Sequence, residues 1–165
     1  MADITFKANP IHTNGELPAV GAQAPKFELV NTSLASKSLA DYAGKRVILT
    51  INPSYDTGVC QATARAFNQK VGESADVVVL MVSADLPFAQ KRFCEAEGLD
   101  HVEALSTYRS DFAKDWGLMM LDGPLQGLTA RAVVVLSPEG KVLYRELVPE
   151  IVQEPDYDAA LAALG

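Results

Sequence analysis

Three short, nearly uninterrupted apolar runs limit the folds open to this chain: VILTI at 47–51, VVVLMV at 77–82 and AVVVL at 132–136. A strand with one face in water alternates apolar and polar residues, whereas a strand covered on both faces is apolar at consecutive positions. Even the longest run is far too short to cross a bilayer, which takes about 20 apolar residues. The runs therefore predict the buried strands of an α/β protein with a central mixed sheet.

Helical patterns follow the first two runs. Between the runs at 47–51 and 77–82, small or apolar residues recur at helical spacing, namely Cys60, Ala64, Phe67 and Val71. This spacing predicts a strand–helix–strand unit with a right-handed crossover. A second helix is expected over Leu86–Gly98, with Asp85 as its N-cap and Pro87 in its first turn.

The two ends of the chain carry weaker patterns. Short β-like stretches at Ile4–Lys7 and Ile11–Thr13, with Asn14-Gly15 as a turn signal, predict an N-terminal β-hairpin over about residues 1–17. The third apolar run and Val142–Val148 should form a second hairpin, and Pro155–Leu164 a final helix. No repeat or linker-like change of composition divides the chain, so we expect one domain over residues 1–165.

Charge and composition argue against several function classes. The chain has 14 Lys and Arg against 21 Asp and Glu, a net charge of −7, so nucleic acid and anionic membranes should repel it. The start, MADITFKANP, lacks the apolar core of a secretory signal and favours a cytoplasmic protein. Two cysteines and two distant histidines show no metal-ligand spacing, so neither a metal nor another cofactor is expected. In a reducing cytosol, those cysteines should pair only transiently.

Cys60 stands where the first strand gives way to a helix. If Thr57 is the N-cap, its hydroxyl can accept a hydrogen bond from the N–H of Val59 or Cys60, and Cys60 becomes the third helical residue. Free N–H groups and the helix dipole favour a thiolate there. Pro53 can shield one side of the sulfur. Position alone also fits a small buried hydrophobe, because free cysteine is among the most buried residue types.

The surrounding pattern resembles a known family. Pro53, Thr57 and Cys60, spaced as P-x-x-x-T-x-x-C, resemble the peroxiredoxin signature. Three longer strings, PSYDTGVC, SADLPFAQKRFC and DGPLQGLTARAVVV, are similar to those of the bacterial thiol peroxidases, an atypical two-cysteine branch. The resemblance covers nearly the whole chain. It implies a thioredoxin-like fold, with helices flanking a central mixed sheet and an N-terminal hairpin extension.

The resemblance also implies a chemistry. Cys60 would be the peroxidatic cysteine, whose thiolate attacks a hydroperoxide oxygen and becomes a sulfenic acid. Thr57 would hydrogen-bond the sulfur and the peroxide. Arg131, which by position alone could equally be a surface residue, would stabilise the developing charge.

Cys94, 34 positions after Cys60 and on another helix, would be the resolving cysteine of an intramolecular disulfide. A disulfide tolerates only a short Cα separation, so if the reduced fold holds the two cysteines farther apart, the first turn carrying Cys60 and part of the Cys94 helix must loosen before it closes. The resemblance further implies thioredoxin as reductant, a hydroperoxide as substrate and a homodimer.

Two rival functions remain compatible with the residues. The thiol–disulfide oxidoreductases share the fold, but the missing Cys-x-x-Cys argues against that class. A redox sensor could use the same disulfide to change a binding surface. The sequence leaves open whether hydrogen peroxide or an organic hydroperoxide is preferred, and Tyr55, bulkier than expected beside the Asp-Thr-Gly-Val-Cys string, could alter substrate access.

Overall fold

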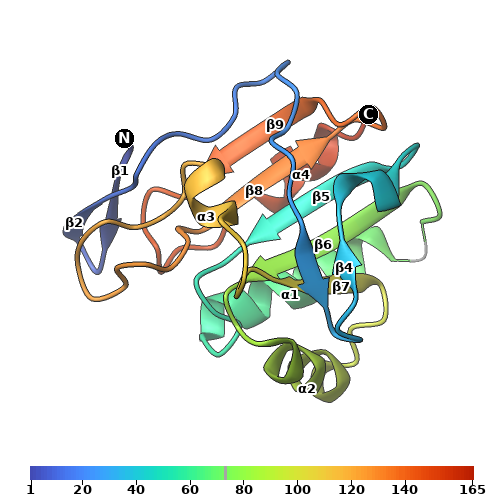
Figure 1. Ribbon diagram of the computed structural model, residues 1–165, viewed down its shortest axis with the longest axis horizontal. Helices are drawn as coiled ribbons and strands as arrows, with labels where there is room; N and C mark the ends of the chain where they lie inside the picture. Colours follow the sequence, from blue (N-terminus) through green and yellow to red (C-terminus); the bar gives the residue numbers. More distant parts are fainter. Residues whose placement is uncertain (73) are drawn as a thin grey trace.

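The computed structural model describes residues 1–72 and 74–165 and contains a seven-stranded mixed sheet with strand order β4-β3-β7-β6-β5-β8-β9 (Figure 1). The sheet strands are β3 (Leu29–Asn31), β4 (Ser36–Lys37), β5 (Arg46–Ile51), β6 (Val77–Ser83), β7 (Val102–Ser106), β8 (Ala132–Leu136) and β9 (Val142–Leu147). A separate hairpin consists of β1 (Asp3–Phe6) and β2 (Asn9–His12). The helices are η1 (Leu39–Tyr42), α1 (Gly58–Val71), α2 (Pro87–Glu97), α3 (Phe112–Asp115) and α4 (Tyr157–Ala162).

The three apolar runs form three adjacent inner strands, β6, β5 and β8, and these are buried as predicted. β5 pairs with β6 in parallel and with β8 antiparallel, so the sheet is mixed. β6 also pairs in parallel with β7, a strand that the sequence pattern did not predict. The units β5–α1–β6 and β6–α2–β7 are therefore two consecutive strand–helix–strand crossovers.

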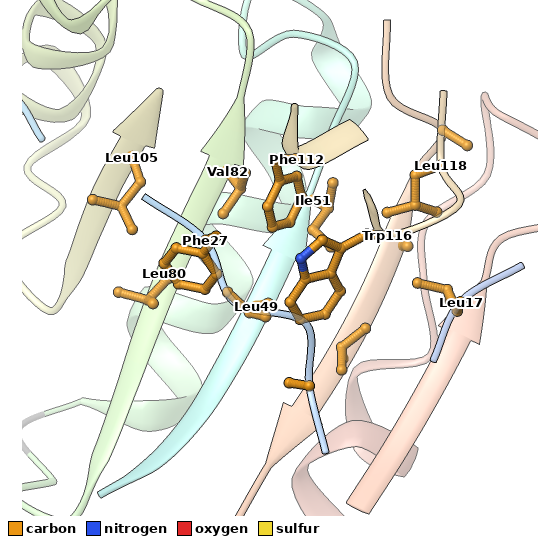
Figure 2. Close-up of a cluster of buried hydrophobic side chains, with 14 of the residues drawn as sticks. Leu17, Phe27, Leu49, Ile51, Leu80, Val82, Leu105, Phe112, Trp116 and Leu118 are labelled. Carbon is orange, nitrogen blue, oxygen red and sulfur yellow. The ribbon is translucent and has the colours of Figure 1, made fainter. Parts of the chain in front are cut away.

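The alternation of side chains along the central strands divides the core between the two faces of the sheet. On one face, Leu49 and Leu80 pack with Phe27 and with Trp116, which follows α3 (Figure 2). On the other face, Ile48 packs among residues of α1 and α4. A third cluster on this second face contains both cysteines, and its buried members are Tyr55, Cys60, Ala64, Met81, Leu99 and Ala104.

The parallel pairing determines where the two long helices begin. β5 and β6 point the same way, so α1 and α2 both start at the carboxyl edge of the sheet. β8 runs in the opposite direction, with Ala132 opposite Ile51, so the residue before β8 lies at that same edge. The edge therefore brings together the starts of two helices and Arg131.

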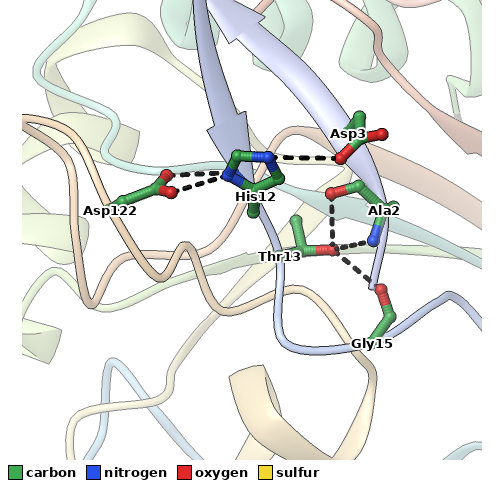
Figure 3. Close-up of polar contacts among 6 residues, drawn as sticks. All are labelled: Ala2, Asp3, His12, Thr13, Gly15 and Asp122. Carbon is green, nitrogen blue, oxygen red and sulfur yellow. Dashed lines mark hydrogen bonds and ion pairs between the residues drawn. The ribbon is translucent and has the colours of Figure 1, made fainter.

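The N-terminal hairpin is present, but its turn is not the predicted one. The chain reverses at Lys7 and Ala8, which both have positive φ (50° and 67°) as a type I′ turn requires, and not at Asn14-Gly15. His12 contacts the carboxylate of Asp122 at 2.7 Å, and the Thr13 hydroxyl donates to the Gly15 carbonyl (Figure 3). The His12–Asp122 contact attaches the hairpin to the rest of the chain, whereas the Thr13 bond is local.

Within residues 1–72 and 74–165, no helix has both the length and the apolar character needed to span a bilayer.

Candidate active site

Cys60 lies in the first turn of α1, as predicted. Thr57 is the N-cap residue, α1 begins at Gly58, and Cys60 is the third helical residue. The Cys60 side chain is fully buried, and Nη1 of Arg131 donates a hydrogen bond to its sulfur at 2.9 Å. A sulfur at a helix N-terminus thus also contacts a guanidinium, and both features favour negative charge on that sulfur.

The predicted side-chain cap at Thr57 is wrong. Its hydroxyl donates to the carbonyl of Ser54 at 3.1 Å, so it closes the turn before the helix and does not accept from a helical N–H. Across the part of the chain that the structure describes, no hydrogen bond joins Thr57 to Cys60. Pro53 is buried in the same loop, directly after Asn52.

Arg131 is almost fully buried, with 2% of its surface exposed. Nε donates to the carbonyl of Ile151 at 2.8 Å, and Nη1 donates to Oδ1 of Asn52 at 2.9 Å. Among the described residues, no carboxylate lies within ion-pair distance of this guanidinium. Buried cations are costly unless an anion compensates them, and the group in contact that can become anionic is the Cys60 thiol.

Asn52 orients the arginine, and the sequence analysis missed it. Besides accepting from Arg131, its amide donates to the hydroxyl of Tyr55 at 2.8 Å and to Oγ1 of Thr50 at 3.2 Å. Its backbone carbonyl accepts from the Thr129 hydroxyl. The signal in the sequence was an asparagine immediately after an apolar run, because an amide buried there must find hydrogen-bond partners.

Tyr55 belongs to the core under the site and does not lie at its surface. Only 2% of it is exposed, and its hydroxyl donates to the carbonyl of Thr50. Its ring stacks on that of Phe93 in α2, with centroids 5.5 Å apart. Burial, and secondarily the neighbouring Cys60, raises the pKa of Tyr55 well above its usual value, so this phenol stays protonated.

Cys94 is half-buried on α2 and packs against the same cluster that contains Cys60. Burial, with a smaller effect from the charge of Glu95, raises the pKa of the Cys94 thiol to about 11. The thiol is therefore protonated at neutral pH. Both cysteines are free in this structure.

The N-cap of α2 differs from the sequence analysis. Leu86 is the N-cap, and the Asp85 side chain instead accepts hydrogen bonds from the loop before α1. On the inner face of the helix, Gln90 is only 1% exposed. Gln90 can be buried because its amide nitrogen donates to Ser83 and to a strand carbonyl.

The described residues contain no group of three or more His, Cys, Asp or Glu side chains that could hold a metal ion. The polar side chain in contact with the Cys60 sulfur is the guanidinium of Arg131, a donor suited to oxygen and sulfur anions.

Comparison with known proteins fits this geometry. The Redoxin family model matches residues 19–161. A thiol peroxidase from Mycobacterium tuberculosis is 53% identical over 165 residues, which covers 100% of this chain and 99% of the relative. The chain belongs to the thiol peroxidases of the redoxin family. The thiol peroxidase of Corynebacterium glutamicum is 49% identical with both chains fully covered.

A solved structure supports the fold assignment. A peroxiredoxin-like protein from Aquifex aeolicus superimposes with a TM-score of 0.93 at 36% identity, covering 99% of this chain and 96% of that one. The expected thioredoxin-like peroxiredoxin fold with an N-terminal hairpin is therefore confirmed.

Proposed function

We propose that this thiol peroxidase reduces hydrogen peroxide and organic hydroperoxides at the sulfur of Cys60. The contact between Arg131 and Cys60, 2.9 Å long and fully buried, is the observation that carries the proposal. A guanidinium with no carboxylate partner among the described residues favours negative charge on the sulfur that it contacts. It can also stabilise the charge that develops on oxygen as the O–O bond breaks.

The first step oxidises Cys60 by two electrons. The thiolate attacks the terminal oxygen of the hydroperoxide, an S–O bond forms, and the O–O bond breaks. The leaving oxygen takes a proton and departs as water or as an alcohol, and Cys60 remains as a sulfenic acid.

Pro53 and Thr57 support this step in our proposal. Pro53 is buried beside Asn52 and shields the sulfur from bulk water. The Thr57 hydroxyl, which bonds Ser54 in this structure, lies on the exposed side of the helix start and turns toward the peroxide when substrate binds. Apo hydrogen bonds at catalytic sites commonly rearrange in this way.

The second step joins Cys60 to Cys94. The sulfur of Cys94 attacks the sulfenic sulfur, an S–S bond forms, and the S–O bond breaks. The hydroxyl departs as water with the proton of Cys94. A thioredoxin-type dithiol then reduces the disulfide and restores both thiols.

The second step requires movement of the backbone. Cys60 is the third residue of α1 and Cys94 the eighth of α2, and both helices start at one edge of the sheet. Five residues correspond to about 7–8 Å of rise along a helix, so Cys94 lies deeper in α2 than Cys60 does in α1. A disulfide bridges Cα atoms at most about 7 Å apart, so we propose that the helix starts loosen before it closes.

We also propose a cytoplasmic location, a single domain over residues 1–165 and a homodimer. The two free cysteines are consistent with a reducing compartment. The backbone bonds from Thr5 to Pro149 and from Ile151 to Thr5 join the N-terminal hairpin to the end of the chain, which supports one domain.

Peroxide consumption coupled to thioredoxin tests the proposal. We expect full turnover from the wild type and none from Cys60→Ser. Cys94→Ser should complete one turnover and stop as a sulfenic acid. Sustained turnover by Cys60→Ser would refute the assignment.

A further inference from the structure

We propose that Asp85 is a positioning residue that ties the loop before α1 to the start of α2 and thereby slows disulfide formation between Cys60 and Cys94. The proposal rests on the peroxidase function above. It concerns only the second step, in which the S–S bond forms and water leaves.

The Asp85 carboxylate collects three hydrogen bonds. Oδ1 accepts from the Ser54 hydroxyl at 2.8 Å, and Oδ2 accepts from the Tyr55 backbone N–H at 2.8 Å and from the Ser83 hydroxyl at 2.8 Å. Its own backbone carbonyl accepts from Ser106 at 2.6 Å. Asp85 is thus fixed at the ends of β6 and β7, and it holds the segment that leads into the Cys60 turn.

The same network continues into the helix that carries Cys94. The Ser83 hydroxyl, which donates to Asp85, accepts from Nε2 of Gln90 at 3.1 Å. Gln90 lies one turn before Cys94 on the same face of α2, because four residues separate them. A continuous chain of bonds therefore runs from the loop before Cys60 to the turn before Cys94.

A second, apolar connection runs beside the polar one. The Tyr55 ring, whose backbone N–H bonds Asp85, stacks on Phe93, the neighbour of Cys94. The Tyr55 hydroxyl is bonded to Asn52, which in turn holds Arg131 on the sulfur of Cys60. Asp85 therefore stabilises the arrangement in which the reduced Cys60 sulfur contacts Arg131.

This arrangement favours the first step and opposes the second. The reaction with peroxide takes place with the first turn of α1 folded, whereas in our proposal disulfide formation requires this turn to move away from its position. Displacing Ser54 and Tyr55 breaks bonds to a carboxylate, which are stronger than bonds between neutral groups. The rate of disulfide formation should rise when these bonds are removed.

Asp85→Asn tests the proposal, because an amide offers one acceptor oxygen where the carboxylate offers two, and hydrogen bonds to a neutral acceptor are weaker than those to a carboxylate. Rapid-quench mass spectrometry after one equivalent of hydrogen peroxide follows the disulfide, and the Cys94→Ser background isolates sulfenic acid formation. We expect disulfide formation about tenfold faster than in the wild type, the ratio produced by about 1.4 kcal/mol. Sulfenic acid formation should be no faster. Disulfide formation at or below the wild-type rate would overturn the proposal.

Two further variants complete the design. Ser54→Ala removes one of the three bonds, should accelerate disulfide formation by about threefold, and decides the question if Asp85→Asn does not fold. Asp56→Asn removes the same charge from the same loop, where no side-chain bond of Asp56 is present among the described contacts, and should match the wild type. Equal acceleration by Asp56→Asn would contradict the role of the Asp85 bonds. A wild type whose Cys60 does not react with peroxide would instead refute the proposed function.

Discussion

At the scale of single residues, the site depends on a buried cation whose partners are a sulfur, an amide oxygen and a backbone carbonyl. The sequence predicts that Arg131 lies at the end of a buried strand, because it directly precedes the apolar run AVVVL. Its orientation depends on Asn52 and Ile151, which are 79 and 20 positions away. Such distant pairs carry no local signal in one sequence.

Replacing Arg131 with methionine should slow Cys60 oxidation by at least about 100-fold, the usual effect of removing one preorganised donor from a developing charge. Stopped-flow measurement of the first step in the Cys94→Ser background provides the rate. Arg109→Met is the matched control, because Arg109 is an exposed arginine bonded to Ser36. Equal rates for the two variants would show that the buried contact has no role in the reaction.

Cys94 makes the second step dependent on pH. Its pKa is raised to about 11, so between the ordinary thiol value of about 8.5 and 11 the folded helix keeps a proton that an unfolded one releases. Unfolding of α2 therefore becomes easier as pH rises through this window. We expect the rate of disulfide formation to rise with pH up to about 11 and then level off, because the loosened helix with an ionised thiol becomes more populated until the folded thiol itself ionises. A rate that levels off near pH 8.5 would contradict the raised pKa of Cys94.

At the scale of elements, hydrophobic pattern alone predicted the buried strands β5, β6 and β8 and both long helices. It failed at β7, where the sequence VEALS contains only partly buried residues at its start and a glutamate whose carboxylate accepts from Tyr42. It also failed at the hairpin turn, where Lys7 and Ala8 take positive φ in spite of their side chains. Tertiary pairing decides both features, so neither could be inferred from local preferences.

Two glycines that follow helices differ in the space around them, so their alanine variants can be compared. Gly98 ends α2 with φ of 63° and open space around it, whereas Gly117 follows α3 with φ of 69° and an added Cβ would overlap the Glu16 backbone. Gly98→Ala should lower the free energy of unfolding by about 1 kcal/mol, and Gly117→Ala by about 3 kcal/mol or more. Urea denaturation measures both. Equal losses would mean that the close approach at Gly117 is relieved by movement.

At the scale of the whole molecule, the N-terminal hairpin is attached next to a segment that also holds Arg131. Thr5 bonds the backbone at Pro149 and Ile151, and the Ile151 carbonyl accepts from Arg131. The family resemblance predicted that such an extension exists. It gave no indication that the extension contacts the residues behind the site, because that contact joins the two ends of the chain.

Hairpin attachment should weaken as pH rises. The hydrogen bond to Asp122 is the main reason why the pKa of His12 is raised, and the same bond lowers the pKa of Asp122. The pair therefore stabilises the folded state below the ordinary pKa of histidine, and this stabilisation is lost as pH rises through the raised value. His12→Gln should be less stable than the wild type at about pH 5.5 and nearly equal to it at about pH 8.5 in thermal denaturation. A difference that does not depend on pH would contradict this account.

The central claim is that the sulfur of Cys60 receives an oxygen atom from a hydroperoxide, and that this oxygen leaves as water when Cys94 forms the disulfide. Intact-protein mass spectrometry after one equivalent of hydrogen peroxide tests this most directly. The wild type should lose two hydrogen atoms and yield a peptide pair that joins Cys60 to Cys94, and Cys94→Ser should gain one oxygen atom at Cys60. An unchanged mass for Cys60 in both proteins, or oxidation of Cys94 alone, would contradict the account.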